Sequence, residues 1–276
     1  MIVLPPEVWV PAAMAGGLGL ACSAALGAAA RFFAVTEDPR VEQLAALLPG
    51  VNCGACGQAG CVEYAKQMAF EGAAPNLCKP GGPETAAKLA AALGVEVVAQ
   101  ERNVALVLCG GDDSLAHRQF AYNGVADCAA AAAVWGGDKA CGYGCLGLGT
   151  CARVCPASAI EITPGRLAVV HPELCIGCGL CVKACPRKII RLVPESRTIH
   201  VLCSSKDRGP VVKKKCKVGC IGCSLCVKKA GGDAIRMDGP LAVINYAAPL
   251  DNPDVPAVCP QRCIVVRSGG KPQAQP

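Results

Sequence analysis

The apolar positions of this chain form one long uncharged stretch followed by short runs. From Val8 to Ala30, 23 consecutive residues carry no charge. A helix needs roughly 20 such residues to cross the hydrocarbon core of a membrane. The stretch therefore predicts a transmembrane anchor. A cleaved secretion signal and a buried helix of a soluble protein are the alternatives, but a secretion signal favours a basic start and this chain begins MIVLPPE.

The residues in and around this stretch predict its packing and orientation. Glycines within 16–19 offer a small-residue face to partner helices. Arg31 and Arg40 follow the stretch, so the excess of positive charge predicts that the rest of the chain lies in the cytoplasm. Cys22 lies mid-span and is interpreted as a small apolar residue.

Further along the chain, the apolar pattern predicts short helices and strands. Residues 62–71 and 84–93 are expected to be helical, the second helix ending at Gly94. The β-branched runs occur twice in the same order, at 103–109, 159–162 and 167–170, and again at 199–203, 234–237 and 241–244. The chain therefore contains an internal repeat. Segment 110–140 occurs only in the first copy and contains an alanine-rich helix to which no function is assigned.

Cysteine is the outlying residue in the composition, with 22 among 276 residues. A disulfide scaffold of that density is normally short and secreted. Here the cysteines cluster in Cys-x-x-Cys steps, which are too close for easy pairing and well spaced for metal. Thiolates that must stay reduced also place the cysteine-rich part in the cytoplasm.

One run of cysteines indicates which metal. The sequence Cys175-Ile-Gly-Cys178-Gly-Leu-Cys181-Val-Lys-Ala-Cys185-Pro186 has the spacing of bacterial ferredoxins. At this spacing three thiolates bind one iron–sulfur cube and the fourth binds a second cube. Zinc sites usually combine two Cys-x-x-Cys pairs separated by a dozen or more residues, so the run favours iron and sulfide.

A second cysteine pattern precedes the repeat. Cys53, Cys56 and Cys61 lie among glycines that allow tight turns, and Cys78 follows the expected helix. Four thiolates make one complete 4Fe–4S site. A zinc knuckle is the alternative.

The crossing rule of two-cluster ferredoxins assigns ligands within the repeat. Leu148 occupies the expected middle-cysteine position of the first copy, so Cys141 is predicted to substitute for it. In the second copy, Ala230 and the missing cysteines would have held one cube, and the ligands of the other cube remain. Cys216 is an alternative ligand there. The predicted sets are Cys141, Cys145, Cys151 and Cys185; Cys155, Cys175, Cys178 and Cys181; and Cys220, Cys223, Cys226 and Cys259.

Several cysteines and charges stay outside these sets. Cys109 and Cys203 end strands at matching repeat positions, and a shared structural role is the favoured interpretation; no role is assigned to Cys128 or Cys263. The basic run 206–217, with Lys228 and Lys229, is either a solvated face, a docking surface for an acidic electron carrier, or a contact with acidic lipid.

The remaining composition excludes other chemistry. A net charge of +6 with 4% aromatic residues argues against nucleic-acid binding. The sequence has no phosphate-binding loop and no dinucleotide motif. The three histidines are scattered and are expected to be surface or packing residues. No catalytic residues are predicted, so the chemistry is electron transfer.

The predicted fold class is α+β, with a transmembrane helix, a small cysteine-loop domain and tandem ferredoxin-like domains. The expected boundaries are a membrane anchor at 1–31, a 4Fe–4S domain at 32–93, an intervening strand and helix segment at 94–140, a two-cluster ferredoxin-like domain at 141–195, a second ferredoxin-like domain with one cluster site lost at 196–267, and a disordered tail at 268–276.

The order of these parts resembles the RnfB family, the iron–sulfur polyferredoxins of the Rnf ion-translocating electron-transport complex. The resemblance rests on the apolar span, NCGACGQAGC, GGDKACGYGCLGLGTCARVCP, CIGCGLCVKACP and CSSKDRGPVVKKKCKVGCIGC, and covers roughly residues 5–265. It implies a single-pass protein of the cell inner membrane, with its cluster domains in the cytoplasm. There it would relay electrons from soluble ferredoxin toward other Rnf subunits, as part of an ion-translocating ferredoxin:NAD oxidoreductase. Four 4Fe–4S clusters are expected.

Two other functions fit parts of the same pattern. One is a free-standing, membrane-tethered polyferredoxin that serves another oxidoreductase. The other is a zinc-rich interaction protein without a redox role. Co-purification with partner subunits distinguishes the first, and metal content distinguishes the second.

Overall fold

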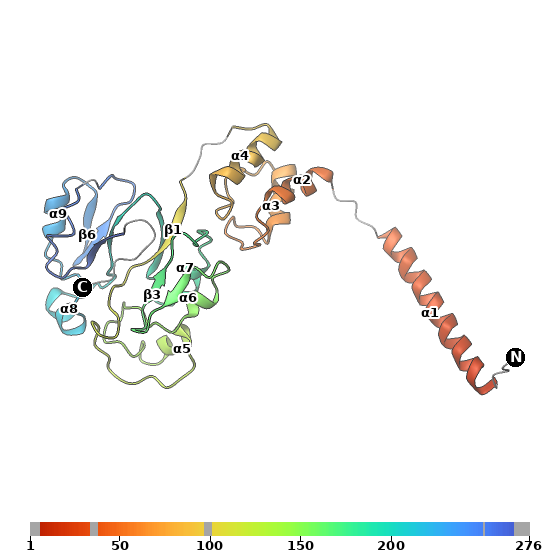
Figure 1. Cartoon of the computed structure of the whole chain (residues 1–276), viewed down its shortest axis with the longest axis horizontal. Coiled ribbons are helices and arrows are strands. Elements are labelled where there is room, and N and C mark those ends of the chain that lie inside the picture. The colour runs from red at the N-terminus through yellow and green to blue at the C-terminus, as the bar shows by residue number, and fades with distance from the viewer. Residues whose placement is uncertain (1–5, 34–37, 97–100, 251, 268–276) are drawn as a thin grey trace.

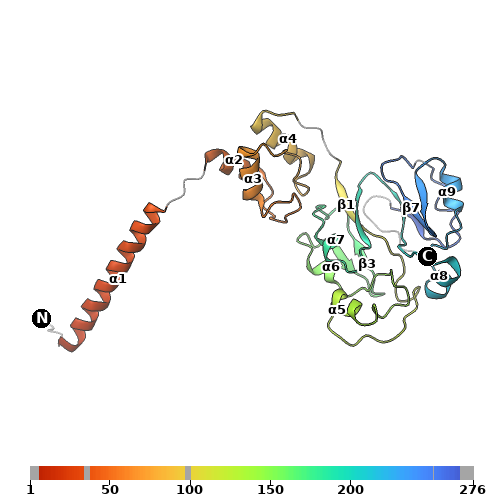
Figure 2. The same ribbon diagram turned by 180° about the vertical axis from the view of Figure 1, so that it is seen from behind.

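The computed structural model describes residues 6–33, 38–96, 101–250 and 252–267, with side chains from residue 13 onward. The tail predicted to be disordered lies outside the described residues. Along the chain the elements are α1 (Pro6–Phe32), α2 (Pro39–Leu47), α3 (Cys61–Phe70), α4 (Gly82–Leu93), β1 (Asn103–Val107), α5 (Cys128–Ala133), α6 (Thr150–Arg153), β2 (Ile160–Ile162), β3 (Ala168–Val170), α7 (Leu180–Ala184), β4 (Ile190–Pro194), β5 (Ile199–Val201), α8 (Gly209–Lys215), α9 (Leu225–Ala230), β6 (Ile235–Asp238), β7 (Leu241–Ile244) and β8 (Ile264–Val266). Figures 1 and 2 show α1 as a single rod that projects away from the other elements.

Helix α1 has the length and composition of a membrane span. Its segment Ala13–Phe32 has 20 residues and a mean hydropathy of 1.5. Leu18, Leu20 and Leu26 are exposed in the isolated chain. The transfer of apolar side chains from water into lipid is favourable in free energy, so a helix that exposes such side chains is suited to a bilayer. It is the one such helix among the described residues.

Helices α2, α3 and α4 pack around a small core of their own. Val41, Leu44, Met68 and Leu89 are buried together around Tyr64. The Tyr64 hydroxyl donates to the Ala74 carbonyl at 2.6 Å and accepts from the Leu77 amide at 3.2 Å. These bonds fix the loop that leads to Cys78. The two predicted helices are confirmed here, and Gly94 ends α4 in the left-handed conformation with φ of 67°.

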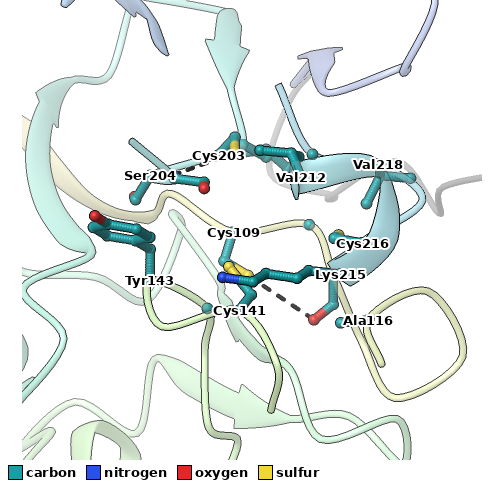
Figure 3. Close-up of a pocket in the computed structure, with 16 residues that line it drawn as sticks. Cys109, Ala116, Cys141, Tyr143, Cys203, Ser204, Val212, Lys215, Cys216 and Val218 are labelled. Atoms are coloured by element: carbon teal, nitrogen blue, oxygen red, sulfur yellow. Dashed lines mark hydrogen bonds between the residues drawn. The ribbon is translucent and has the colours of Figure 1, made fainter. Parts of the chain in front are cut away.

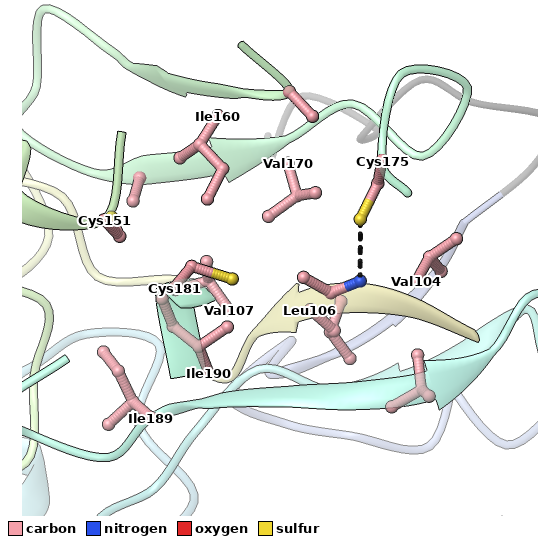
Figure 4. Packing of buried hydrophobic residues seen from close by; sticks show 14 of the residues in the cluster. Val104, Leu106, Val107, Cys151, Ile160, Val170, Cys175, Cys181, Ile189 and Ile190 are labelled. Atoms are coloured by element: carbon pink, nitrogen blue, oxygen red, sulfur yellow. Dashed lines mark hydrogen bonds between the residues drawn. The ribbon is translucent and has the colours of Figure 1, made fainter. Parts of the chain in front are cut away.

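The first repeat copy is built from two antiparallel strand pairs. β1 pairs with β4 from Asn103↔Pro194 to Val107↔Ile190, and β2 pairs with β3. The buried side chains of these strands form one core with the cysteines of α6 and α7, as Figure 4 shows. Strand β1 was expected in the intervening segment, but its pairing with β4 makes it part of this unit. We call residues 103–194 the first unit.

The second copy repeats this strand pairing. β5 pairs with β8 from Ile199↔Val266, and β6 pairs with β7 from Ile235↔Ile244. Its own buried core includes Val201, Ile235 and Val255. We call residues 199–266 the second unit.

Segment 110–140 is held to the first unit by buried charges. Asp138 is fully buried and accepts from Arg118 at 2.8 Å and from Arg166 at 2.7 Å. Lys139 is 1% exposed and donates to the Gly111 carbonyl at 3.0 Å. The two arginines lower the pKa of Asp138 against the opposing effect of burial, so its carboxylate stays ionised. Buried ions that are paired and hydrogen-bonded fix one arrangement of the segment.

His200 gives the second unit a pH-dependent stability. Its side chain is 1% exposed, its Nδ1 lies 3.0 Å from the Tyr246 hydroxyl, and burial lowers its pKa to about 4. Between that value and the ordinary pKa of about 6.5 the unfolded chain binds more protons, so the free energy of unfolding falls as the pH drops through this window. We expect a loss of about 1 kcal/mol between pH 7.5 and 5.5.

Anaerobic urea unfolding at the two pH values measures this effect. His200→Gln should remove most of the pH dependence. The control is His117→Gln, because His117 is exposed, and it should leave the dependence intact. An equal pH dependence in the unsubstituted chain and in His200→Gln would contradict this assignment.

Candidate iron–sulfur centres

The first cysteine set lies in the loops around α3. Cys53, Cys56, Cys61 and Cys78 are half-buried. Cys56, Cys61 and Cys78 pack against the same small core. Burial raises the pKa of Cys78, and the charges of the other three cysteines add to this rise. The Asn52 side-chain oxygen accepts from the Cys61 amide at 2.7 Å and holds the loop closed. The structure thus brings this predicted set together.

The second set lies beside β1 in the core of the first unit. The Cys175 sulfur accepts from the Ala105 amide at 3.4 Å, as the dashed line in Figure 4 marks. The Cys155 sulfur accepts from the Ala159 amide at 3.3 Å. Burial raises the pKa of Cys181 to about 12, with the charges of Cys175, Cys178 and Cys155 adding to it. All four predicted members are therefore neighbours.

The third set differs from the prediction at one position. Cys128, Cys145, Cys151 and Cys185 line one cavity. Burial and the charges of Cys145, Cys128 and Cys185 raise the pKa of Cys151 to about 12. Cys141 was predicted in place of Cys128, but it lies in a different cavity.

The N-terminal cap of α5 explains this difference. Asp127 accepts from the amides of the first turn and from the Thr150 hydroxyl at 2.8 Å. Thr150 in turn accepts from the Cys128 amide at 2.7 Å. Cys128 is thereby held beside α6, which carries Cys151. The sequence signal that could have found it is Leu148: a missing middle cysteine requires a ligand from elsewhere, and segment 110–140 contains one unassigned cysteine.

The fourth set lies in the second unit and has an additional member. Cys220, Cys223, Cys226 and Cys259 line one cavity together with Cys263. The Cys259 and Cys263 sulfurs are 3.5 Å apart. A hydrogen bond from the Cys263 thiol lowers the pKa of Cys259 to about 5 and that of Cys220 to about 6. Sequence reasoning missed Cys263.

The cysteine sets fit iron–sulfur clusters by their donor chemistry and their spacing. Among the described residues, no group of three or more histidine, cysteine, aspartate or glutamate side chains is arranged to hold one metal ion. The sulfurs of the third and fourth sets line cavities. Burial and like charges raise the pKa of several of these thiols, including Cys145 to about 11. A cationic iron–sulfur core bound by these residues would offset both effects and favour the deprotonated thiols.

The fold and these sites define an iron–sulfur protein with several centres and a helix suited to a membrane. Comparisons with known proteins agree. Residues 48–80 match the family described as "Putative Fe-S cluster", and residues 142–192 match "4Fe-4S dicluster domain". These ranges contain the whole of the first and second sets and three of the four cysteines of the third set.

Relatives identify the family over most of the chain. The B subunit of the ion-translocating oxidoreductase complex of Methanosarcina acetivorans is 39% identical over 92% of this chain and 97% of its own length. The B subunit of the Na⁺-translocating ferredoxin:NAD⁺ oxidoreductase complex of Acetobacterium woodii is 40% identical, with 93% and 77% covered. The proton-translocating counterpart of Clostridium ljungdahlii is 42% identical, with 83% and 81% covered. The chain belongs to this family, the B subunits of ion-translocating (Rnf) oxidoreductase complexes.

Proposed function

We propose that this chain is the electron-transfer subunit of an ion-translocating ferredoxin:NAD oxidoreductase complex. Reduced ferredoxin would be the donor, and other Rnf subunits in the membrane would receive the electrons. When bound, 4Fe–4S clusters with four cysteine ligands supply one-electron transfer at low potential, which suits electrons from ferredoxin. The chain itself supplies the thiolates, their burial and the amides that donate to sulfur.

The observation that supports this function most is the packing of the second and third cysteine sets together. Cys145 and Cys151 of the third set and Cys175 and Cys181 of the second set lie in one buried core. The shared strand pairing of the two units also favours a tandem of ferredoxin-like modules. Such a series is suited to pass electrons along the chain.

We place the donor at the second unit and the membrane at the other end. Cys223 is exposed, so the fourth set lies within reach of a soluble partner. Of the four sets, the first is the nearest to α1 along the chain, which favours a position close to the bilayer for this set. Arg31 at the end of α1 favours the cytoplasmic side for all sets.

Cys259→Ala combined with Cys263→Ala tests this direction. The double substitution leaves only three cysteines around the fourth cavity and leaves the cores of the other sets untouched. After mixing with reduced ferredoxin, the visible iron–sulfur absorbance of this variant should bleach more slowly than that of the unsubstituted chain. Dithionite should still reduce the remaining clusters. Unchanged ferredoxin-dependent reduction would sink the proposal. Purification of the chain alone, with full activity and no partner subunits, would favour a free-standing polyferredoxin.

The basic surface of α8 is expected to steer the donor. Lys213 and Lys214 are exposed in the last turn of this helix. Opposite charges on two proteins accelerate their encounter. At 0.1 M salt, charges separated by more than about 10 Å are largely screened, so the acceleration is weaker. In Lys213→Glu/Lys214→Glu the rate of reduction by ferredoxin should fall roughly ten-fold at low salt.

Stopped-flow reduction at two ionic strengths measures this effect. The matched control is Lys88→Glu in α4, where an exposed lysine of the same charge lies far along the chain from the second unit. The two variants should differ at low salt and converge at high salt. Equal rates of reduction of the two variants at low salt would indicate that the lysines of α8 form a solvated face and do not steer the donor.

A further inference from the structure

A cavity outside the four sets is lined by four more cysteines. Cys109, Cys141, Cys203 and Cys216 surround it, as Figure 3 shows. The cavity and its open mouth together hold about 430 Å³, compared with about 340 Å³ for the cavity of the fourth set and 350 Å³ for that of the third. This cavity is therefore comparable in size to the cavities of those two sets.

The four cysteines come in pairs from matching positions of the two repeat copies. Cys109 follows β1 and Cys203 follows β5. Cys141 and Cys216 each stand four residues before a member of another set, Cys145 and Cys220. Each unit thus contributes two sulfurs, so the cavity lies where the units meet. A structural role for Cys109 and Cys203 alone does not explain why Cys141 and Cys216 join them.

Backbone amides point at the sulfurs, again in matching pairs. The Cys145 amide donates to the Cys109 sulfur at 3.4 Å, and the Cys220 amide donates to the Cys203 sulfur at 3.3 Å. Cys109 and Cys203, which follow equivalent strands, therefore each accept a backbone amide proton. Such bonds stabilise thiolates bound to iron–sulfur clusters and tune their potentials.

The surroundings disfavour free thiolates at this position. Burial raises the pKa of Cys203 to about 12, and it also raises the pKa of Cys141 and Cys216. The thiolate charge of Cys109 adds to the rise in the pKa of each of these three cysteines. Amides that stabilise thiolates and burial that opposes them are reconciled when a cationic core occupies the cavity.

Glycine at 111 keeps the space for such a core open. A Cβ atom there would approach the Cys216 sulfur to 3.0 Å. Residues 109–111 read Cys-Gly-Gly in the first copy, where the second copy has Cys-Ser-Ser.

We propose that Cys109, Cys141, Cys203 and Cys216 hold a fifth 4Fe–4S cluster between the two units. It lies between the third and fourth sets, because Cys145 and Cys220 contact its ligands directly through their amides. This role rests on the proposed function: the fifth cluster accepts one electron from the fourth site and passes one electron on to the third site. Each transfer oxidises one cluster and reduces its neighbour, and no bond or proton changes.

Metal analysis of the full chain tests the site independently of any activity. Anaerobically purified Cys109→Ala/Cys203→Ala should contain about four irons and four sulfides fewer than the unsubstituted chain. Cys141→Ala/Cys216→Ala should show the same loss, and combining all four substitutions should not increase it. The matched control is Ser204→Ala in the same cavity, which should leave the iron content unchanged.

Equal iron contents in the double variants and the unsubstituted chain would overturn the site, as would stoichiometric zinc in place of the iron. If the substituted chains do not fold, native mass spectrometry of the unsubstituted chain decides. A species with five clusters supports the site, and a maximum of four overturns it.

The relay role has a separate readout. In Cys109→Ala/Cys203→Ala, ferredoxin should still reduce the fourth site, but reduction of the clusters of the first unit should slow by more than ten-fold. A loss of four irons with an unchanged rate of electron transfer would support the cluster site and would contradict its role in the relay. Loss of transfer at the fourth site itself would instead contradict the proposed direction of electron flow.

Discussion

Cys128→Ala combined with Cys185→Ala is expected to remove about four irons, no more than either substitution alone. The structure places both cysteines around one cavity, so each single substitution already destroys the same cluster. Cys141→Ala combined with Cys185→Ala should remove about eight irons, because these cysteines line different cavities. Iron and acid-labile sulfide, measured anaerobically, separate the two patterns.

The reverse pattern would restore the ligand set expected from the sequence. In that case Cys141 and Cys185 would give the non-additive pair, and Cys128→Ala would have no effect on the iron content. Cys22→Ala is the control for loss of a cysteine as such, since Cys22 lies on α1 and outside every cavity described above.

Deleting residues 1–37 is expected to release the chain from the membrane. A hydrophobic span inserts in an effectively irreversible way, and α1 is the described helix with the required length and composition. Loss of the anchor also removes the high local concentration near partner subunits, so ferredoxin-driven NAD reduction by membranes should fall roughly 100-fold. Fractionation, iron content and membrane activity measure the three consequences.

The iron content of the released chain is the internal control. The cores of the three cluster-bearing parts contain no residue of α1, so the truncated chain should keep its full iron content. A subtler variant is Leu20→Arg, which places a charge mid-span at a cost of about 3 kcal/mol. Retention of the truncated chain in the membrane pellet would show that contacts with partner subunits, and not α1, hold it there.

The local parts of the fold could be predicted, because local sequence determines them. Helices α3 and α4 and the strands β2, β3, β6 and β7 follow from apolar pattern and turn residues over a few positions. The first and second cysteine sets follow from motif spacing. Both depend on short loops whose geometry is fixed by the chain itself.

The parts that could not be predicted depend on distant contacts. Pairing of β1 with β4 joins residues about ninety positions apart, and no local pattern specifies it. Cys128 reaches its cavity through the bonds of Asp127 and Thr150. Convergence of Cys109 and Cys203 needs both units to be folded and in contact. Their equivalence in the repeat was visible, but their meeting was not.

The cysteine sets differ in how much of the chain must exist before each can close. The first set is complete at Cys78, within one small core, whereas the second needs residues up to Cys181 and the third needs residues up to Cys185. The cavity between the units needs Cys216, and the fourth set needs Cys259. During synthesis on the ribosome, where N-terminal domains generally fold first, metal loading is therefore expected to proceed from the N-terminal set toward the C-terminal set. A chain interrupted in this process lacks the sites nearest its C-terminus.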